Sequence, residues 1–327
     1  MRAVIARAPG GPEVLSLVEL PDPVPGAGEV VVRVAVAGVN FIDTYRRAGI
    51  YRMTFPHVVG SEGVGVVVAT GPDVADLQPG QRVAWLTSAG SYAELAVVKA
   101  TDALVVPPGV DDETAVALAM QGITAHYLTT STVDLQPGDD VLLTAAAGGV
   151  GLLATQLATR RGARVIGLVG SPEKAELARN AGAADVVRYR ELADLTADLP
   201  PLVRSLTGGA GVRVAYDSVG KDTFDASLAS LRPRGFLVLF GASSGPVPPF
   251  DLQRLNAAGS AYVTRPSIAA YSRTREELQW RADEVLGLAA TGELSVRIGA
   301  RFPLDRAADA HRALEGRATT GKVLLVP

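Results

Sequence analysis

The pattern of hydrophobic and polar positions changes near Gly122. Before that point, short runs of β-branched residues alternate with turns rich in proline and glycine, which predicts a small barrel-like β domain. A helix is expected from Asp111 to Met120, with acidic residues in its first turn. The predicted strands of this part are residues 29–36, 63–68, 82–85 and 93–97.

Beyond Gly122, strand-like runs alternate with helix-like segments, which is typical of a parallel doubly wound sheet. Gly162, Gly182 and Gly235 are interpreted as residues that end helices. The predicted strands are 140–144, 164–169, 185–189, 213–217, 236–241 and 260–264, with helices near 149–161, 172–181, 191–207 and 222–231.

The remaining segment predicts a helix over 274–290, a strand over 295–298, a helix over 305–315 and a strand over 322–326. These elements need a surface to pack on, and the simplest solution returns them to the first domain. We therefore expect an α/β protein with a β-rich domain, residues 1–122 and 266–327, and a dinucleotide-binding domain, residues 123–265.

A glycine-rich turn between the strand at 140–144 and the following helix is the strongest functional signal. A small residue, Ala146, permits the tight turn; Gly148 lets the backbone approach a pyrophosphate, and Gly151 lets the helix pack against the sheet. Gly149 and Val150 open the helix, whose N-terminal N–H groups favour phosphate. The order of strand, turn, helix and strand predicts a dinucleotide site rather than an ordinary turn.

The end of the second strand of this unit indicates which dinucleotide binds. NAD sites place an acidic residue there, whereas this chain continues as Gly170, Ser171, Pro172, Glu173 and Lys174. Ser171 can donate to a 2′-phosphate and Lys174 can place an ammonium beside it, so we expect NADPH. The alternative is that Ser171 only caps a helix and Lys174 is only a solvated surface charge.

Composition narrows the class of protein. A net charge of −3, with 31 basic and 34 acidic residues, gives no electrostatic footprint for nucleic acid or for a membrane surface. With no cysteine, disulfides, thiolate catalysis and Cys-ligated zinc are excluded. Neither a signal peptide nor a membrane span is recognisable, so a cytoplasmic enzyme is expected. The three histidines, at positions 57, 126 and 311, show no metal-ligand spacing and are interpreted as satisfied or surface residues, so no metal is expected.

Several motifs in their expected order resemble the zeta-crystallin-like quinone oxidoreductase family of the medium-chain dehydrogenase/reductase superfamily. The resemblance covers essentially the whole chain. Its motifs are residues 39–45, 60–65, 145–151, 216–220, 240–245, 262–266 and 317–321.

The resemblance implies a GroES-like catalytic domain, a Rossmann domain and zinc-free reduction of quinones by NADPH in the cleft between them. Ser61 stands where zinc-dependent relatives carry a histidine. A quinone is already electron-poor, so hydride transfer to it needs no Lewis acid. The family is usually homodimeric, and the exposed edge expected for the strand at 260–264 favours the same conclusion.

The resemblance also assigns roles to individual residues. The catalytic candidates are Tyr51 at the substrate mouth, Asn40, and Arg265 at the cleft. Tyr51 could stack on a quinone or donate to its oxygen. Around the cofactor, Asn40, Asp43, Tyr45 and Phe240 are implied near the nicotinamide, and Tyr189 and Arg317 near the adenosine phosphate.

Each of these roles has a structural alternative. Asn40 and Asp43 are common turn residues, Tyr51 could be a half-buried loop residue, Arg317 a surface charge and Arg265 part of a salt bridge.

Two functional alternatives also stay open. One is an enone or enal reductase of the same superfamily; the other is a protein that binds NADPH without turnover, as crystallin or RNA-binding relatives do.

Overall fold

The computed structural model describes residues 1–317 and 319–327. It divides into two compact units, one formed by Met1–Ile123 with Thr274–Pro327 and the other by Thr124–Arg273. In the described part of the chain, none of the helices is both long enough and apolar enough to cross a membrane.

The second unit is built on a parallel sheet with the strand order β11-β10-β9-β12-β13-β14. This is the order of a Rossmann fold, and it reverses direction between β9 and β12. Its strands are β9 (Asp140–Thr144), β10 (Arg164–Val169), β11 (Asp185–Arg188), β12 (Val212–Asp217), β13 (Leu231–Leu239) and β14 (Tyr262–Thr264).

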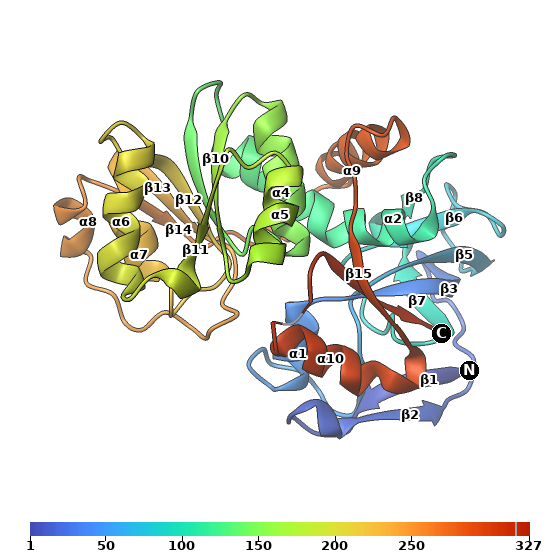
Figure 1. Ribbon diagram of the computed structural model, residues 1–327. Helices are drawn as coiled ribbons and strands as arrows, with labels where there is room; N and C mark the ends of the chain where they lie inside the picture. The colour runs from blue at the N-terminus through green and yellow to red at the C-terminus, as the bar shows by residue number, and fades with distance from the viewer. Residues whose placement is uncertain (318) are drawn as a thin grey trace. The chain divides into compact units, whose positions relative to one another are not determined.

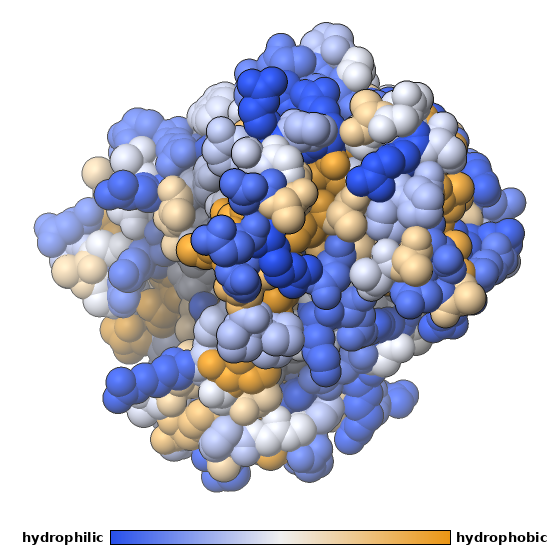
Figure 2. Space-filling view, turned by 90° about the vertical axis from the view of Figure 1, so that its left-hand side faces the viewer, coloured by the Kyte–Doolittle hydropathy of each residue, from blue (hydrophilic) through white to orange (hydrophobic). Residues whose placement is uncertain are grey.

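Helices cover both faces of this sheet, because its central strands are apolar on both sides. α4 packs against α5 and α6 packs against α7, and Figure 1 shows these two pairs on opposite sides of the sheet. Figure 2 is turned so that the left-hand side of Figure 1 faces the viewer. It shows the surface there as mostly polar, with separate hydrophobic patches. The helical segments are α3 (Ile123–Tyr127), η4 (Leu128–Thr132), α4 (Gly149–Arg160), α5 (Pro172–Asn180), η5 (Tyr189–Glu191), α6 (Leu195–Leu206), α7 (Phe224–Ala229) and α8 (Gln253–Ala257).

The first unit contains a large mixed sheet and a small antiparallel one. The small sheet has the order β2-β1-β4, and the large sheet has the order β15-β16-β3-β5-β6-β8 with β7 also paired to β3. The strands are β1 (Arg2–Ala6), β2 (Leu15–Glu19), β3 (Glu29–Val39), β4 (His57–Val58), β5 (Glu62–Thr70), β6 (Arg82–Trp85), β7 (Leu95–Lys99), β8 (Leu104–Val105), β15 (Ile298–Pro303) and β16 (Lys322–Val326).

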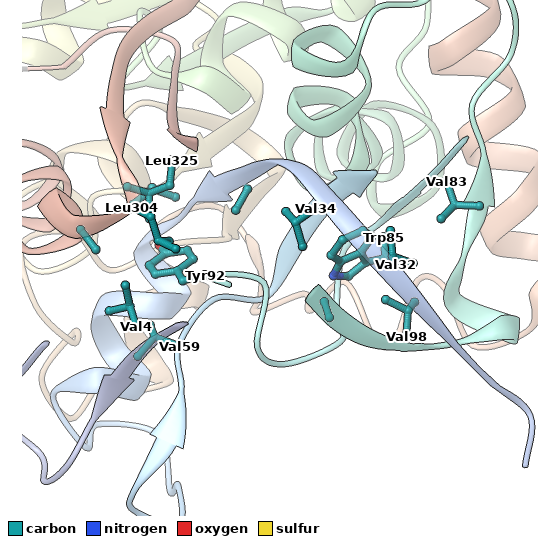
Figure 3. Close-up of a cluster of buried hydrophobic side chains, with 14 of the residues drawn as sticks. Val4, Val32, Val34, Val59, Val83, Trp85, Tyr92, Val98, Leu304 and Leu325 are labelled. Atoms are coloured by element: carbon teal, nitrogen blue, oxygen red, sulfur yellow. The ribbon is translucent and has the colours of Figure 1, made fainter. Parts of the chain in front are cut away.

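The C-terminal segment packs on this first unit from Thr274 onward, whereas residues 266–273, which were expected in the first domain, belong to the second unit. β16 pairs with β3, and α10 packs against α1 and β16. Val4, Val59, Tyr92, Leu304 and Leu325 meet in the resulting core (Figure 3). The helical segments are η1 (Pro12–Val14), α1 (Phe41–Arg47), η2 (Ala100–Asp102), α2 (Asp112–Ala117), η3 (Leu118–Gly122), α9 (Arg275–Ala290), η6 (Leu304–Arg306) and α10 (Ala307–Glu315).

Three of the differences between the predicted and observed elements have a clear structural reason. Gly235 does not end a helix but lies within β13, where the register to β12 shifts and Arg234 has a φ of 59°. The strand expected at 295–298 runs instead from Ile298 to Pro303, where its backbone pairs with β16. The helix expected from Asp111 is α-helical only to Ala117 and continues as a π-helical turn.

Candidate active site

The glycine-rich turn joins β9 to α4 and closes tightly on itself. A Cβ atom on Gly151 would collide with the carbonyl oxygen of Ala145 and lie 2.9 Å from the Cα atom of Ala146. Gly148 is the N-cap of α4, and no side chain caps this helix end. The first N–H groups of α4 therefore have no intrahelical acceptor, and they form a cradle suited to a pyrophosphate.

The loop after β10 brings together four residues expected at the cofactor. Ser171 caps α5 by accepting a hydrogen bond from the backbone N–H of Lys174 at 3.3 Å. The hydroxyl of Ser171 keeps its own hydrogen for a phosphate oxygen, so capping and phosphate binding are compatible. A Cβ atom on Gly170 would lie 2.9 Å from the hydroxyl oxygen of Tyr189, which places that ring against the loop.

A buried carboxylate at the end of β12 organises the point where the strand order reverses. Asp217 is fully buried, and it accepts hydrogen bonds from the hydroxyls of Thr223 and Ser227 at 2.7 Å. Its backbone carbonyl accepts from the N–H of Phe240 at 2.8 Å. Asp217 therefore fixes both the loop after β12 and the start of the loop after β13. Asp217 lies in the motif of residues 216–220, but the sequence did not indicate a role for this residue.

In the first unit, Asn40 begins α1 and belongs to a buried polar cluster. Asn40 and Asp43 form a capping box, in which the carboxylate of Asp43 accepts from the Asn40 N–H at 3.0 Å. The amide Nδ2 of Asn40 donates to Glu62 at 2.7 Å, and its Oδ1 accepts from the ammonium of Lys322 at 3.0 Å. Lys322 also forms an ion pair with Glu62, and both side chains are fully buried. The orientation of the Asn40 amide is therefore fixed by one donor and one acceptor.

The carboxylate of Asp43 is the end point of a second set of hydrogen bonds. Ser61 donates to it at 2.6 Å and accepts in turn from Arg46 at 2.6 Å. The hydroxyl of Tyr92 lies 3.3 Å from the other carboxylate oxygen. Burial raises the pKa of Asp43 to about 6, although the hydrogen bonds from Ser61 and from the Asn40 backbone oppose this shift.

His311 connects Tyr92 to Arg47 on the far side of the carboxylate. Its Nδ1 lies 3.0 Å from Nη1 of Arg47, which can only donate, so Nδ1 accepts and Nε2 carries the ring hydrogen. Nε2 then donates to the Tyr92 hydroxyl at 3.1 Å, leaving the hydroxyl hydrogen for Asp43. Burial lowers the pKa of His311 to about 3, and the charge of Arg47 acts in the same direction. This histidine is therefore a satisfied structural residue.

Two tyrosines expected near the reacting groups lie together. The rings of Tyr45 and Tyr51 meet edge to face at 5.9 Å between centroids. Tyr51 keeps 43% of its surface exposed. An aromatic face that is held by a neighbour and open to solvent suits the stacking of a flat ligand.

The remaining site candidates from the sequence are Arg265, Phe240 and Arg317. Arg265 is exposed and donates to the carbonyl oxygen of Leu239 at 2.9 Å. Among the described contacts it has no carboxylate partner, so the structural alternative of a salt bridge is wrong, and its role at the cleft stays a prediction. Phe240, which follows Leu239 in the chain, is half-buried. Arg317 follows α10 with a φ of 55° and belongs to the same unit as Asn40. Among the described residues, no group of three or more His, Cys, Asp or Glu side chains could hold a metal ion.

Sequence reasoning found Asn40 and Asp43 but missed most of the residues that hold them. The missed residues, which contact Asn40 and Asp43 directly or through other side chains, are Arg46, Arg47, Glu62, Tyr92, Glu315 and Lys322. In the Rossmann unit, the role of Asp217 was missed as well. A charged residue at an otherwise apolar position was the available signal, because Lys322 begins a terminal strand whose following residues are all apolar.

Comparisons with known proteins identify the class and then the family. The family described as "Alcohol dehydrogenase GroES-like domain" matches residues 26–108, and "Zinc-binding dehydrogenase" matches residues 149–282. The chain is therefore a GroES-like domain combined with a Rossmann domain, in the medium-chain dehydrogenase/reductase superfamily.

Individual relatives narrow this class. A quinone oxidoreductase of Pseudomonas aeruginosa is 45% identical over 97% of both chains. The crystal structure of Escherichia coli quinone oxidoreductase complexed with NADPH superimposes with a TM-score of 0.96 at 41% identity, covering all of both chains. A 2-haloacrylate reductase of a Burkholderia species is 39% identical over 100% of this chain and 99% of its own. The chain belongs to the quinone oxidoreductase family.

Proposed function

We infer that this protein is an NADPH-dependent quinone reductase. The observation that carries this conclusion is the family relationship over 97% of both chains, together with a dinucleotide cradle that has the required form. When bound, NADPH supplies a hydride to the electron-poor quinone ring. The oxygen that gains charge takes its proton from solvent water.

The residues of this chain fit the cofactor at two places. The N-terminus of α4, with Gly148 and Gly151, would hold the pyrophosphate, since a side chain at Gly151 would collide with the backbone of Ala145 and Ala146 and disrupt the turn. Ser171, Lys174 and Tyr189 hold the 2′-phosphate at the ends of β10 and β11. The cluster around Asn40 orients its amide, which we propose contacts the nicotinamide end, and Tyr45 and Tyr51 present aromatic faces to the acceptor.

A second candidate function is reduction of an activated carbon–carbon double bond. The similarity to a 2-haloacrylate reductase favours it, because that relative is also aligned over nearly its full length. The two activities share the same hydride donor. A panel of ortho- and para-quinones, enones and enals, assayed with NADPH and NADH, separates them. An enone or enal with the highest kcat/KM would favour the second candidate, and binding of NADPH without any turnover would contradict both.

Tyr51→Ala tests the placement of the acceptor. We expect kcat/KM for quinones to fall by roughly 10-fold or more, because stacking contributes about 0.5–1.5 kcal/mol and a hydrogen bond to a charged oxygen about 1.5–3 kcal/mol. NADPH affinity should change little. Tyr51→Phe is the matched variant, since it keeps the ring and removes only the hydroxyl. A Tyr51→Ala protein with weaker NADPH binding and normal quinone kinetics would refute this placement.

We also propose that the protein is a homodimer joined through the edge of the Rossmann sheet. β14 stands at the end of the strand order, and Tyr262 and Val263 on it are 54% and 38% exposed. Sedimentation at micromolar concentration should give a dimer, and lysines in place of both residues should shift it towards monomer. Val24→Lys, at a residue 84% exposed in the other unit, is the control. A monomeric unmodified protein would rule this out.

The cytoplasm stays the expected compartment. Localisation of the tagged protein by microscopy or fractionation tests this expectation.

A further inference from the structure

A small pocket in the first unit lies beside the residues proposed to meet the acceptor. Its walls include Asp43 and Arg46 from α1, and Met53, His57 and Val59 from the segment that follows Tyr51. The enclosed space is close to that of about one water molecule, so it admits a single substituent and not a ring.

Arg46 brings a positive charge to this pocket. One of its guanidinium nitrogens donates to Ser61 at 2.6 Å. Within residues 1–317 and 319–327, the Arg46 guanidinium makes no other hydrogen bond and no ion pair. A guanidinium carries five N–H donors, so several remain for an oxygen atom that enters the pocket.

His57 brings an acceptor to the same pocket. Its Nδ1 lies 3.2 Å from the carbonyl oxygen of Thr54, which can only accept, so Nδ1 carries the hydrogen and Nε2 keeps its lone pair. Burial lowers the pKa of His57, and the neighbouring charge of Arg46 acts in the same direction, so the ring is neutral at neutral pH. The ionisable groups that share the pocket with it are Asp43 and Arg46.

We propose that this pocket receives an acidic hydroxyl substituent of a ring acceptor, whose oxygen accepts a hydrogen bond from Arg46 and whose hydrogen is donated to Nε2 of His57. A group with a hydrogen to donate and an oxygen that can carry negative charge matches this combination of cationic donor and neutral acceptor, whereas an alkyl or alkoxy group does not. The proposal rests on the proposed function, and it identifies hydroxyquinones as the preferred class of quinone.

The test compares 2-hydroxy-1,4-naphthoquinone with its 2-methoxy analogue, which has neither the hydrogen nor the charge. Arg46→Met should lower the ratio of kcat/KM for the hydroxy over the methoxy compound by about 10-fold or more, because a charge-assisted hydrogen bond is lost. Comparing ratios removes the difference in intrinsic reactivity between the two quinones. Arg52→Met is the matched control, since Arg52 is an exposed arginine of the neighbouring loop, and its ratio should stay at the unmodified value.

An equal loss on both quinones would overturn the proposal, because Arg46 would then act only through Ser61 and Asp43. Direct titration of the two compounds into the unmodified NADP⁺ complex gives a second measurement that needs no variant. The hydroxy compound should bind about 10-fold more tightly or better, and equal affinities would overturn the proposal. A protein that binds the hydroxy compound selectively but reduces neither quinone would support the pocket while refuting the proposed function.

Discussion

Replacing Lys322 by methionine is expected to lower the free energy of unfolding by about 3–5 kcal/mol, because it leaves the carboxylate of Glu62 buried without its counter-ion. Both side chains of this ion pair are fully buried, and Lys322 also donates to the Oδ1 atom of Asn40. The measurement is the shift of the urea and thermal unfolding midpoints. Lys99→Met removes the same charge from an exposed position at the end of β7 and should be nearly neutral.

A double variant tests whether the loss of stability comes from the unpaired buried charge. Glu62→Gln combined with Lys322→Met removes both charges, so it should recover much of the stability lost by the single Lys322 variant. A Lys322→Met protein as stable as the Lys99→Met control would show that the ion pair contributes nothing to folding. The Asn40 amide would still lose its fixed orientation in either Lys322 variant, and we expect kcat to fall with it.

Lys174→Ala is expected to weaken NADPH binding by roughly 10- to 150-fold while leaving NADH binding nearly unchanged. The reason is that an ion pair with the 2′-phosphate is worth about 1.5–3 kcal/mol, and NADH has no such phosphate. The backbone N–H of Lys174 is tied to Ser171, so its side chain starts from a fixed point in the first turn of α5. The measurement is the dissociation constant of each cofactor by fluorescence titration.

Two controls accompany this experiment. Lys99→Ala changes the net charge equally in the other unit and should leave both dissociation constants unchanged. Equal constants for NADPH and NADH in the unmodified protein would refute the proposed role of this loop before any variant is made.

The Rossmann unit was predictable from sequence because its elements are set by local patterns. The glycine turn, the Ser171 cap and the strand-to-helix alternation each lie within a short window, and five of the six strands start or end within one residue of the prediction. Gly235 was misinterpreted because its position in β13 depends on pairing with β12, which no local pattern reveals.

The first unit was less predictable because it depends on contacts between distant residues. β1 was missed, since Arg2–Ala6 is a short run whose strand character comes from pairing with β2 and β4. The same limit applies to the site. Asn40 was found through a motif, but Glu62 and Lys322 are 22 and 282 residues away from it, so their contacts follow only from the fold.

The hydrogen bonds around Asp43 have a direction, and this direction limits how protons move. One chain runs from Arg46 through Ser61, and the other runs from Arg47 through His311 and Tyr92; both end on the same carboxylate. A guanidinium stays protonated throughout the physiological range, so neither outer end can release or capture a proton. The network therefore cannot relay a proton from one guanidinium to the other. The group within it that titrates near neutral pH is the Asp43 carboxylate, whose pKa burial raises to about 6, so a proton taken up by the network binds at Asp43 and goes no further.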